Sequence, residues 1–409
     1  MREIKKTILI AGAGFGGMTA ALKLERRLRN NPAWRIVLID KNPYQLYTPA
    51  LYEIAAIPNE DARQSRLRSI VAIPIAEILK GKKITFIQGV LTNIDRLHQC
   101  VHIGAHELAY AFLILALGSE TNYFDIPGLR EHALPLKRFE DAVRVRNGIE
   151  RMLAGHRLCT VVAGGAGASG VELVAELANF ICHVTGKTVS ETTCPVRLVL
   201  IEMSDHILPG FEPWLVRRAR ARLERIGIEI RAKNCITSVS KTEIMLKDAP
   251  PIRYDMLIWT GGVVGNPLYE NLGLPLTDKK SCTVNEFLQV DDRILAIGDA
   301  AGFVDARSNK PLPWNVPIAE SEARMVARNI LREISGKPKS PFCPSSRYPY
   351  VLAVGRKYAI ADLVFIRFWG FAGWCAKLLV ELRYLLFILP FPRAIRIWLK
   401  GIRVYTSND

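Results

Sequence analysis

Two segments of this chain share one pattern: an apolar run, then closely spaced glycines, then a stretch with helical spacing. The first is ILIAGAGFGGMTAALKLE at residues 8–25, and the second is VVAGGAGASGVELVAEL at residues 161–177. A strand, a GxGxxG turn and a helix in this order form a dinucleotide-binding unit, because the glycines permit a tight turn, close approach to a pyrophosphate and close helix–strand packing. The duplication predicts an α/β chain with two nested Rossmann-like dinucleotide-binding folds.

In the first unit, the spaced glycines Gly12, Gly14 and Gly17 follow the expected strand KTILIA, and a helix begins near Gly16. The next expected strand, WRIVLID, ends in Asp40. A carboxylate at this place accepts hydrogen bonds from a ribose hydroxyl, and the helix N-terminus attracts the pyrophosphate. The residues predicted to bind a dinucleotide here are Gly12, Gly14, Phe15, Gly16, Gly17, Asp40 and Lys41.

The second unit repeats this order with Gly165, Gly167 and Gly170, and its second strand VRLVLIE ends in Glu202. An acid at this position favours NADH, because it accepts a hydrogen bond from the ribose 2′-hydroxyl and repels the 2′-phosphate of NADPH. The distance from turn to acid exceeds the usual spacing of about 20 residues. An inserted loop at residues 182–195 accounts for the excess.

Two further apolar strands are expected to return to the first fold. YAFLILALGS (110–119) closes on a turn at Gly118, and RILAIGDAAGF (293–303) ends at Asp299, where a carboxylate can bind a ribityl chain. These strands lie on either side of the second fold in the sequence, which favours FAD in the first fold and a nicotinamide in the inserted one. The predicted domains are an FAD domain at 1–125 and 280–335, an NADH domain at 126–279 and a C-terminal region at 336–409.

The charge and cysteine content restrict the classes of protein further. The net charge of +16 is compatible with nucleic acid, an anionic membrane or anionic cofactors, but no helix-turn-helix, zinc-finger or RNP-type motif occurs, which argues against nucleic acid. The eight cysteines contain no CxxC pair and are expected to be reduced thiols. No secretory signal is recognised at the N-terminus.

The C-terminal region is apolar and basic at once. Residues 340–409 contain ten Lys and Arg against three Asp and Glu, and no window reaches the 18 uncharged apolar residues typical of a transmembrane helix. After Pro392, basic and apolar residues recur on two faces with helical spacing: Arg393, Arg396, Lys400 and Arg403 on one, and Ile395, Trp398, Leu399 and Ile402 on the other. We expect an amphipathic helix that binds an anionic membrane surface within residues 366–405. The alternative is a helix that packs on the protein's own core.

A metal site is not predicted. His98, His102 and His106 recur every four residues around Cys100, but this segment is expected to form a β-hairpin. Along one strand the outer histidines would be about 26 Å apart, too far to share an ion.

The sequence resembles the type II NADH:quinone oxidoreductases, which are single-chain flavoproteins of respiratory membranes. The resemblance covers nearly the whole chain and is most specific at LIDKNPYQLYTPALYEIA (38–55), GASGVELVAELA (167–178), IEMSDHILPGF (201–211), DMLIWTGGVVGNPL (255–268) and LAIGDAA (295–301). It implies FAD and NADH as cofactors, transfer of electrons to a menaquinone or ubiquinone without proton pumping, and a peripheral location on the cytoplasmic face of the cell membrane. A homodimer is left open.

The resemblance also implies site residues. Glu172 matches a glutamate placed near the flavin, and Glu176 lies one turn further along the same face. Their role would be catalytic, whereas the ordinary alternative is an acid favoured by the helix dipole. The cofactor-lining positions that match are Thr48 with Pro49, Gly262 and Ala319. The family's two quinone-site glutamines are replaced by Pro317 and Ser321, which makes the acceptor the least certain part of the resemblance.

Three other functions remain open from the sequence. A sulfide:quinone oxidoreductase shares the fold but uses a reactive cysteine pair, and the second glycine turn with Glu202 argues against it. An NADH oxidoreductase with a non-quinone acceptor fits the missing glutamines. A non-catalytic redox sensor that binds NADH would have the same two folds.

Overall fold

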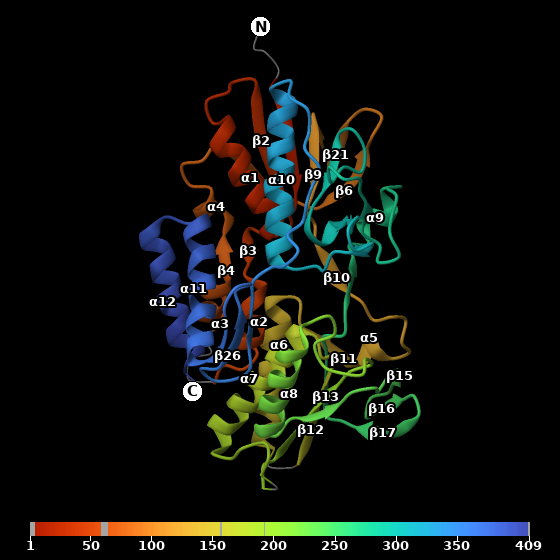
Figure 1. Cartoon of the computed structure of the whole chain (residues 1–409), viewed down its shortest axis with the longest axis vertical. Coiled ribbons are helices and arrows are strands. Elements are labelled where there is room, and N and C mark those ends of the chain that lie inside the picture. Colours follow the sequence, from red (N-terminus) through yellow and green to blue (C-terminus); the bar gives the residue numbers. More distant parts are fainter. Residues whose placement is uncertain (1–4, 59–63, 156–157, 192, 408–409) are drawn as a thin grey trace. The chain divides into compact units, whose positions relative to one another are not determined.

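The structure, a computed structural model, describes residues 5–58, 64–155, 158–191 and 193–407 (Figure 1). Residues 1–4, 59–63, 156–157, 192 and 408–409 belong to the predicted domains but lie outside the described residues. The chain divides into two compact units, each made of three segments. Unit 1 comprises Met1–Gln45, Ile73–Glu120 and Val263–Tyr348, and unit 2 comprises Leu46–Ala72, Thr121–Gly262 and Pro349–Asp409.

Unit 1 is built on a five-stranded parallel sheet in the order β21-β9-β1-β2-β5. Its strands are β1 (Lys6–Ala11), β2 (Trp34–Asp40), β5 (Ile84–Gln88), β9 (Phe112–Leu115) and β21 (Ile294–Ala296). Helices α1 (Phe15–Leu28) and α10 (Val316–Ile334) lie side by side over this sheet (Figure 1). The crossover from β1 through α1 to β2 places the glycine turn at the carboxyl end of the sheet, where open α/β sheets bind ligands.

Smaller elements complete unit 1. An antiparallel sheet contains β6 (Leu91–Asp95), β7 (Cys100–Ile103) and β8 (His106–Ala109). The remaining elements are α4 (Ile75–Ile78), β19 (Val263–Gly265), α9 (Leu268–Asn271), β20 (Cys282–Thr283), η3 (Gly298–Ala300), β22 (Ala301–Gly302), β23 (Val304–Asp305) and β24 (Lys310–Pro311). Three short strands lie where the chain passes between the units: β3 (Tyr44–Leu46), β4 (Ala72–Pro74) and β10 (Ser119–Thr121).

Unit 2 repeats the architecture with a parallel sheet in the order β11-β18-β12-β13-β14. Its strands are β11 (Ala133–Pro135), β12 (Cys159–Gly164), β13 (Val196–Ile201), β14 (Glu229–Arg231) and β18 (Met256–Trp259). Its other elements before the C-terminal segment are η1 (Thr48–Ala50), α2 (Leu51–Ile54), α3 (Gln64–Val71), α5 (Leu129–His132), α6 (Phe139–Ala154), α7 (Ala168–Thr185), α8 (Pro213–Arg225), β15 (Ile236–Val239), β16 (Glu243–Leu246) and β17 (Ala249–Arg253). Helix α7 follows β12 directly, as α1 follows β1.

The central strands of both sheets are buried on both faces. Ile8–Ala11 in β1 and Val161–Gly164 in β12 have almost no exposed surface, and each reads as a continuous apolar run rather than an alternating one. This is the pattern of parallel strands covered by helices on both sides. The predicted fold class, α/β with two Rossmann-like folds, is therefore confirmed.

The C-terminal segment of unit 2 forms an antiparallel sheet followed by two helices. The sheet contains β25 (Tyr350–Ala353), β26 (Ala359–Asp362) and β27 (Arg367–Gly370), and the helices are α11 (Phe371–Ile388) and α12 (Phe391–Tyr405). Helix α11 contacts α12 and all three strands. None of the helices in the described part of the chain is both long and apolar enough to span a lipid bilayer.

The last helix packs into unit 2 with a side that differs from the predicted apolar stripe. The side of α12 that packs into unit 2 consists of Ala394, Ile397, Gly401, Val404 and Tyr405. The predicted apolar stripe is not the packed side: Leu399 is exposed, and Ile395, Trp398 and Ile402 are half-buried. The sequence pattern did not indicate this packed side, because two of its five residues, Ala394 and Gly401, are small.

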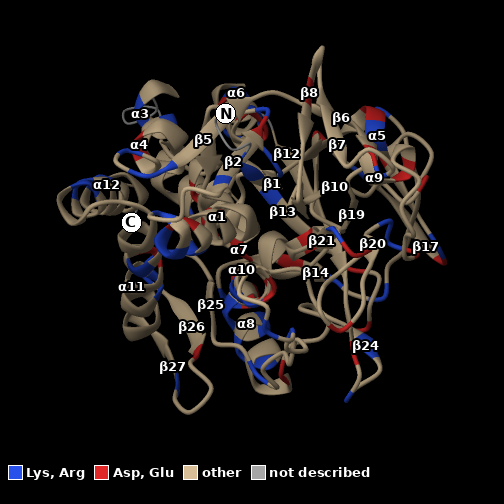
Figure 2. Cartoon of the chain, turned by 90° about the horizontal axis from the view of Figure 1, so that it is seen from above, with Lys and Arg blue, Asp and Glu red and all other residues tan. Residues whose placement is uncertain are grey.

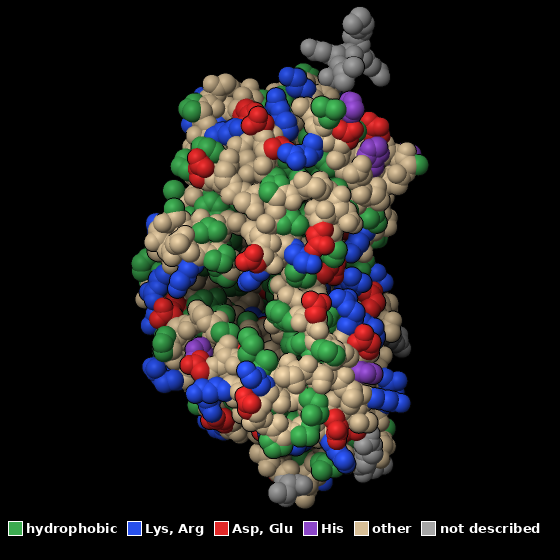
Figure 3. Space-filling view, turned by 90° about the vertical axis from the view of Figure 1, so that its right-hand side faces the viewer, with side chains coloured by type: hydrophobic (Ala, Val, Ile, Leu, Met, Phe, Trp, Pro, Cys, Tyr) green, Lys and Arg blue, Asp and Glu red, His purple; other side chains and the backbone are tan. Residues whose placement is uncertain are grey.

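The positive charge is spread over the surface. On the face shown in Figure 3, Lys and Arg side chains are interspersed with Asp and Glu. Figure 2 shows basic residues on α8, α11 and α12.

Candidate functional site

The glycine turn of unit 1 is so tightly packed that only glycine fits at two of its positions. Gly12 has a φ of +106°, and a Cβ there would lie 2.2 Å from the carbonyl oxygen of Ala116. A Cβ on Gly17 would lie 1.8 Å from the carbonyl oxygen of Gly12. At Gly14, by contrast, a Cβ would have no described atom within 4 Å. The open space in front of the α1 N-terminus is the place that a pyrophosphate occupies in this fold.

Asp40 lies at the end of β2 and holds the glycine turn in place. One carboxylate oxygen accepts the N–H of Ala13 at 2.7 Å, and the other accepts the N–H of Asn42 at 2.8 Å. The neighbouring Lys41 ammonium lies 3.8 Å from the Glu120 carboxylate. The turn is thus preorganised by a side chain from the next strand.

The carboxyl end of β21 brings three polar groups of unit 1 together. Ser119 Oγ donates a hydrogen bond to Asp299 Oδ2 at 2.5 Å, and Glu322 Oε2 accepts the N–H of Gly298 at 2.6 Å. Burial raises the pKa of Glu322 well above its usual range, an effect that the Gly298 hydrogen bond reduces and nearby Asp299 increases. The sequence predicted Asp299 but missed Ser119 and Glu322. The sequence signal for Glu322 is its position three residues after Ala319, which places both residues on the same face of a helix.

Gly16 and Ala319 belong to the same part of unit 1. The two helices approach here, because a Cβ on Gly16 would lie 3.3 Å from the Ile297 side chain and 3.6 Å from the Ala319 carbonyl oxygen. A Cβ on Gly298 would lie 3.2 Å from Ala319 Cβ. The predicted residues Phe15 and Gly118 lie at the start of α1 and in a left-handed turn after β9, respectively.

Helix α10 accommodates the two residues that replace the family's glutamines. Asn315 caps the helix by accepting the N–H of Ile318, and Pro317 lies in the first turn, where no backbone donor is needed. Ser321 is half-buried one turn later.

Unit 2 reproduces the first turn in detail. Gly165 has a φ of +98°, and a Cβ there would lie 2.3 Å from Gly261 Cα. A Cβ on Gly170 would lie 2.0 Å from the Gly165 carbonyl oxygen, whereas a Cβ on Gly167 would have no described neighbour within 4 Å. Glu202 accepts the N–H of Ala166 at 2.8 Å and that of Ser204 at 2.9 Å, as Asp40 does in unit 1. A second dinucleotide cradle with its own acidic cap is the result.

Gly262 and Thr48, both predicted cofactor positions, also lie in unit 2. Gly262 has a φ of +157°, and a Cβ there would lie 3.0 Å from the ring of Phe124. Thr48 begins η1, with Pro49 next to it in the first turn.

Glu172 lies one turn into α7, directly after this second cradle. One of its carboxylate oxygens accepts the N–H of Ala353 at 3.3 Å. Burial raises the pKa of Glu172 to about 8, although the positive charge of Lys377 and the Ala353 hydrogen bond both act to lower it. Glu172 is therefore largely protonated at neutral pH. Glu176, one turn further, is buried and lies 3.4 Å from the Asn179 amide nitrogen.

Helix α11 adds a mostly buried cation that the sequence did not predict. The Lys377 ammonium forms an ion pair with the Glu53 carboxylate; the Glu53 side chain is buried, and that of Lys377 is 16% exposed. Glu381, one turn after Lys377, is also buried. The signal was a Lys–Glu pair at i,i+4 spacing within an otherwise apolar stretch. We had interpreted this stretch only as a membrane-binding surface.

The histidine segment is folded differently from the single strand on which its spacing was judged. A turn after β7 brings β8 back, so that His102 pairs with Glu107 and Ile103 with His106. The distance of about 26 Å along one strand is therefore wrong. Cys100, His102 and Glu107 offer atoms within 4.8 Å of one another. All eight cysteines, which the structure describes, are free thiols.

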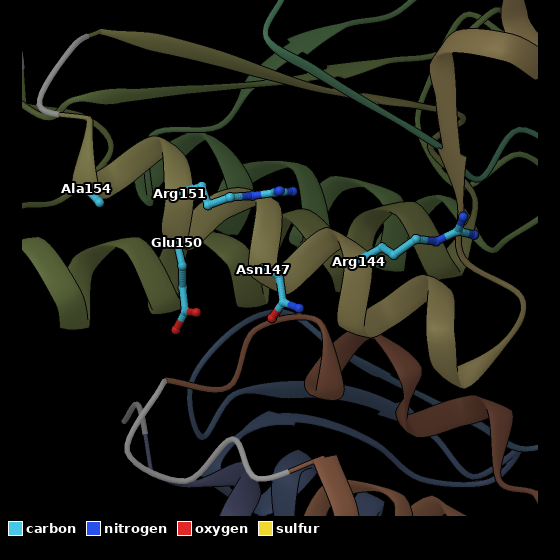
Figure 4. Close-up of a pocket in the computed structure, with 5 residues that line it drawn as sticks. All are labelled: Arg144, Asn147, Glu150, Arg151 and Ala154. Carbon is cyan, nitrogen blue, oxygen red and sulfur yellow. The ribbon is translucent and has the colours of Figure 1, made fainter.

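A shallow hollow on unit 2 lies along α6 and is lined by Arg144, Asn147, Glu150, Arg151 and Ala154 (Figure 4). None of the predicted site residues lines it.

Comparisons with known proteins agree with two dinucleotide cradles in one chain. The family model of the pyridine nucleotide-disulphide oxidoreductases matches residues 6–323. A demethylphylloquinone reductase of Synechocystis is 30% identical over 396 residues, which are 93% of each protein. A type II NADH:quinone oxidoreductase of Staphylococcus aureus is 28% identical over 360 residues, covering 84% of this chain and 86% of the relative.

Two solved structures share the fold. The NDH2 of Plasmodium falciparum, solved in complex with NADH, has a TM-score of 0.84 at 17% identity over 99% of each chain. The sulfide:quinone oxidoreductase of Aquifex aeolicus has a TM-score of 0.77 at 19% identity, covering 93% of this chain and 91% of the other.

The fold and the paired cradles define an oxidoreductase of the pyridine nucleotide-disulphide class. Within that class, the chain belongs to the type II NADH:quinone oxidoreductase family. The resemblance noted from the sequence is confirmed.

Proposed function

We propose that this protein is an FAD-dependent enzyme that oxidises NADH and reduces a membrane quinone without pumping protons. The overall reaction is NADH + H⁺ + quinone → NAD⁺ + quinol. The observation that carries the proposal is the duplicated cradle, in which each unit holds open space at a helix N-terminus beside an acid-capped turn. FAD, when bound, accepts the hydride and gives up two electrons.

Unit 1 fits FAD. The open space at Gly14 accommodates the pyrophosphate, and Asp40 lies where it can hydrogen-bond the adenosine ribose. Asp299, which accepts a hydrogen bond from Ser119, would bind the ribityl chain. The other residues of unit 1 assigned to this site are Gly12, Phe15, Gly16, Gly17, Lys41, Gly118 and Ala319. Thr48, also assigned to cofactor binding, lies in η1 of unit 2.

Unit 2 fits NADH. Gly165, Gly167 and Gly170 form the cradle, Gly262 lines it, and Glu202 selects NADH by repelling the extra phosphate of NADPH. Because both carboxylate oxygens of Glu202 already accept backbone N–H groups, its negative charge is held in place beside the turn.

Glu172 and Glu176 are proposed as the catalytic acids. A carboxyl with a pKa of about 8 can give a proton at neutral pH and regain it from water, because its pKa lies close to the working pH. Glu176 lies on the same helix face and is buried.

The acceptor is proposed to be a quinone. Two relatives are named as a demethylphylloquinone reductase and an NADH:quinone oxidoreductase, and the former has the higher identity of the two. This favours a naphthoquinone, such as menaquinone, over ubiquinone. A non-quinone acceptor is the second candidate, because Pro317 and Ser321 replace the glutamines of the family.

Anaerobic stopped-flow measurement of the flavin absorbance tests both halves of the proposal. NADH should bleach the flavin rapidly, and a menaquinone analogue should restore it faster than a ubiquinone analogue. Bleaching without recovery would reject the quinone and leave the non-quinone acceptor. No bleaching with NADH would reject the NADH half as well.

The enzyme is also proposed to bind the cytoplasmic face of the cell membrane through residues 366–405. Helix α11 packs Leu378, Leu385 and Ile388 into unit 2, yet it also exposes apolar side chains on its outer side. Ten of the eighteen large apolar residues recorded as exposed in the described chain lie between residues 363 and 399: Leu363, Phe365, Ile366, Trp369, Phe371, Leu379, Val380, Leu386, Phe391 and Leu399. Exposed apolar surface beside the basic side chains of α12 suits an anionic membrane.

The double substitution R396Q/R403Q should weaken binding to anionic vesicles. Both arginines are exposed on α12, and each basic residue near an anionic surface contributes about 1 kcal/mol, so the affinity should fall about 30-fold. Vesicle co-sedimentation at two salt concentrations measures the change. The double substitution K241Q/K247Q removes two exposed charges elsewhere on unit 2 and should change binding little. Equal losses in both proteins would show that net charge, rather than α12, determines binding.

A further inference from the structure

The interior of unit 2 contains charged side chains, which are rarely buried in a hydrophobic core. The Lys377–Glu53 ion pair is mostly buried, and Glu381, one turn after Lys377 on the same face of α11, is buried. Removing charged groups from water is costly, and a buried ion pair often contributes little or nothing to stability. A cluster of this kind points to chemistry rather than to packing.

Two tyrosines flank the ion pair. The Lys377 ammonium lies 5.4 Å from the ring centre of Tyr52 and 5.6 Å from that of Tyr405. Both hydroxyls are buried and have no hydrogen-bond partner among the described residues. Buried hydroxyls normally have a partner, so these two indicate positions for internal water.

Helix α12 closes the cluster from the other side. A Cβ on Gly401 would lie 3.5 Å from Glu381 Oε1, so the missing side chain lets the two helices approach at the carboxyl group. The titratable and charged groups that act on the cluster come from four helices and the residue before η1. They are Tyr47 before η1, Tyr52 and Glu53 of α2, Glu172 and Glu176 of α7, Lys377, Glu381, Arg383 and Tyr384 of α11, and Tyr405 of α12.

The charge states follow from burial and from neighbouring charges. Burial raises the pKa of Glu381 to about 8, and the Glu53 carboxylate adds to this rise while Lys377 opposes it. Burial acts to lower the pKa of Lys377, but the charge and hydrogen bond of Glu53 outweigh it and leave the pKa raised. At neutral pH Glu172 and Glu381 are therefore largely protonated, next to the Lys377–Glu53 ion pair.

Quinone reduction requires such a proton. Conversion of a quinone to a quinol takes two electrons and two protons, whereas the hydride of NADH carries two electrons and one proton. The second proton must come from water through the protein. Tyr52 lies close to the ion pair, with the Lys377 ammonium 5.4 Å from its ring centre. Burial raises the pKa of Tyr52, and the nearby acids Glu53, Glu172 and Glu176 add to this rise.

We propose that Glu53, Lys377 and Glu381 form a proton-holding cluster that recharges Glu172. In this cluster Glu53 is a positioning residue that keeps the Lys377 ammonium inside unit 2. Glu381 holds the proton that replaces the one given up by Glu172, and Glu381 then regains a proton from water. The inference rests on the proposed reduction of a quinone.

The substitution E381Q tests the cluster, because glutamine keeps the shape of the side chain but cannot release a proton. We expect turnover with the menaquinone analogue to fall by about tenfold at pH 6, below the loss typical of a direct acid catalyst. The ratio of wild-type to E381Q turnover should approach one at pH 9, because wild-type Glu381 has then lost its proton too. Bleaching of the flavin by NADH should be unchanged in E381Q.

The melting temperature of flavin-free protein gives a second readout that does not depend on turnover. Glu381 has a higher pKa in the folded protein than in the unfolded chain, so the folded state binds the extra proton and the free energy of unfolding falls as pH rises towards 8. The glutamine of E381Q does not titrate, so this fall in the free energy of unfolding is absent in the variant. Its melting temperature relative to wild type should therefore rise by about 2–4 °C between pH 6 and pH 8.

Two controls separate proton holding from structure. E224Q removes an acid from a surface ion pair of α8 and should change neither readout. E53Q should slow quinone turnover, and E53D should restore part of it by keeping a carboxylate near Lys377.

A turnover ratio that is one at pH 6, or that is constant from pH 6 to pH 9, would overturn the delivery of protons by Glu381. A melting difference that does not change with pH would overturn proton holding itself. A wild-type protein that bleaches with NADH but reduces no quinone would reject the proposed function and the delivery step together. The melting difference would then still decide whether Glu381 holds a proton.

Discussion

The substitution G14A should release FAD from a protein that remains folded. A Cβ at this position meets no described atom of the protein, so the fold tolerates the methyl group, but the methyl group enters the space assigned to the pyrophosphate. An extra methyl group in a packed contact costs about 1–3 kcal/mol, equivalent to roughly a 10- to 100-fold loss of affinity. Flavin content after dialysis and the melting temperature of the flavin-free protein measure the two effects separately.

Two other glycines serve as controls for this experiment. G17A should lower the melting temperature of the flavin-free protein, because its Cβ would lie 1.8 Å from the Gly12 carbonyl oxygen. G155A, at the end of α6 with only ordinary van der Waals contacts, should affect neither flavin content nor stability. Full retention of flavin by G14A would show that the pyrophosphate does not lie at the α1 N-terminus.

The substitution E172Q should separate the two half-reactions. We expect NADH to bleach the flavin at close to the wild-type rate, while recovery with quinone slows by about 10²- to 10⁴-fold, the range for loss of a positioned acid. In the wild-type enzyme, recovery should slow as pH rises above about 8, where Glu172 loses its proton. E172Q should lack this dependence on Glu172. Stopped-flow measurements from pH 6 to pH 9 give both rates in one experiment.

The outcome would contradict the role of Glu172 if E172Q recovered at the wild-type rate. A loss of bleaching instead would place Glu172 in NADH binding. E191Q, which removes an exposed acid from the loop after α7, is a matched control and should leave both rates unchanged.

The sequence predicted the two cradles because their geometry is local. Gly12, Gly17 and their counterparts in unit 2 are required by contacts with residues a few positions away or with the end of a neighbouring strand. The short GxGxxG motif is therefore enough to predict the shape of the turn. Asp40 and Glu202 were predicted by position at the ends of their strands. Their hydrogen bonds to the turns, which fix both loops, are a tertiary detail that spacing does not reveal.

The buried cluster could not be predicted in the same way. Sorting residues into polar and apolar faces assumes that water covers the polar face, and two charged residues of α11 depart from this: Glu381 is buried and Lys377 is mostly buried, while Leu379 is exposed. The partner of Lys377 is Glu53, more than 300 residues earlier in the chain. Nothing in either local sequence indicates that the two side chains meet. The same difficulty affected Glu322 and Ser119, whose partners come from distant segments of unit 1.

The apolar side chains that α11 leaves exposed have a consequence for handling the purified protein. Leu379, Val380 and Leu386 are exposed on the outer side of α11. The hydrophobic effect favours their removal from water by contact with a second copy as well as by contact with lipid. In buffer without detergent or vesicles, copies should therefore associate through this helix. A particle size measured there would report the absence of a bilayer rather than a native oligomer.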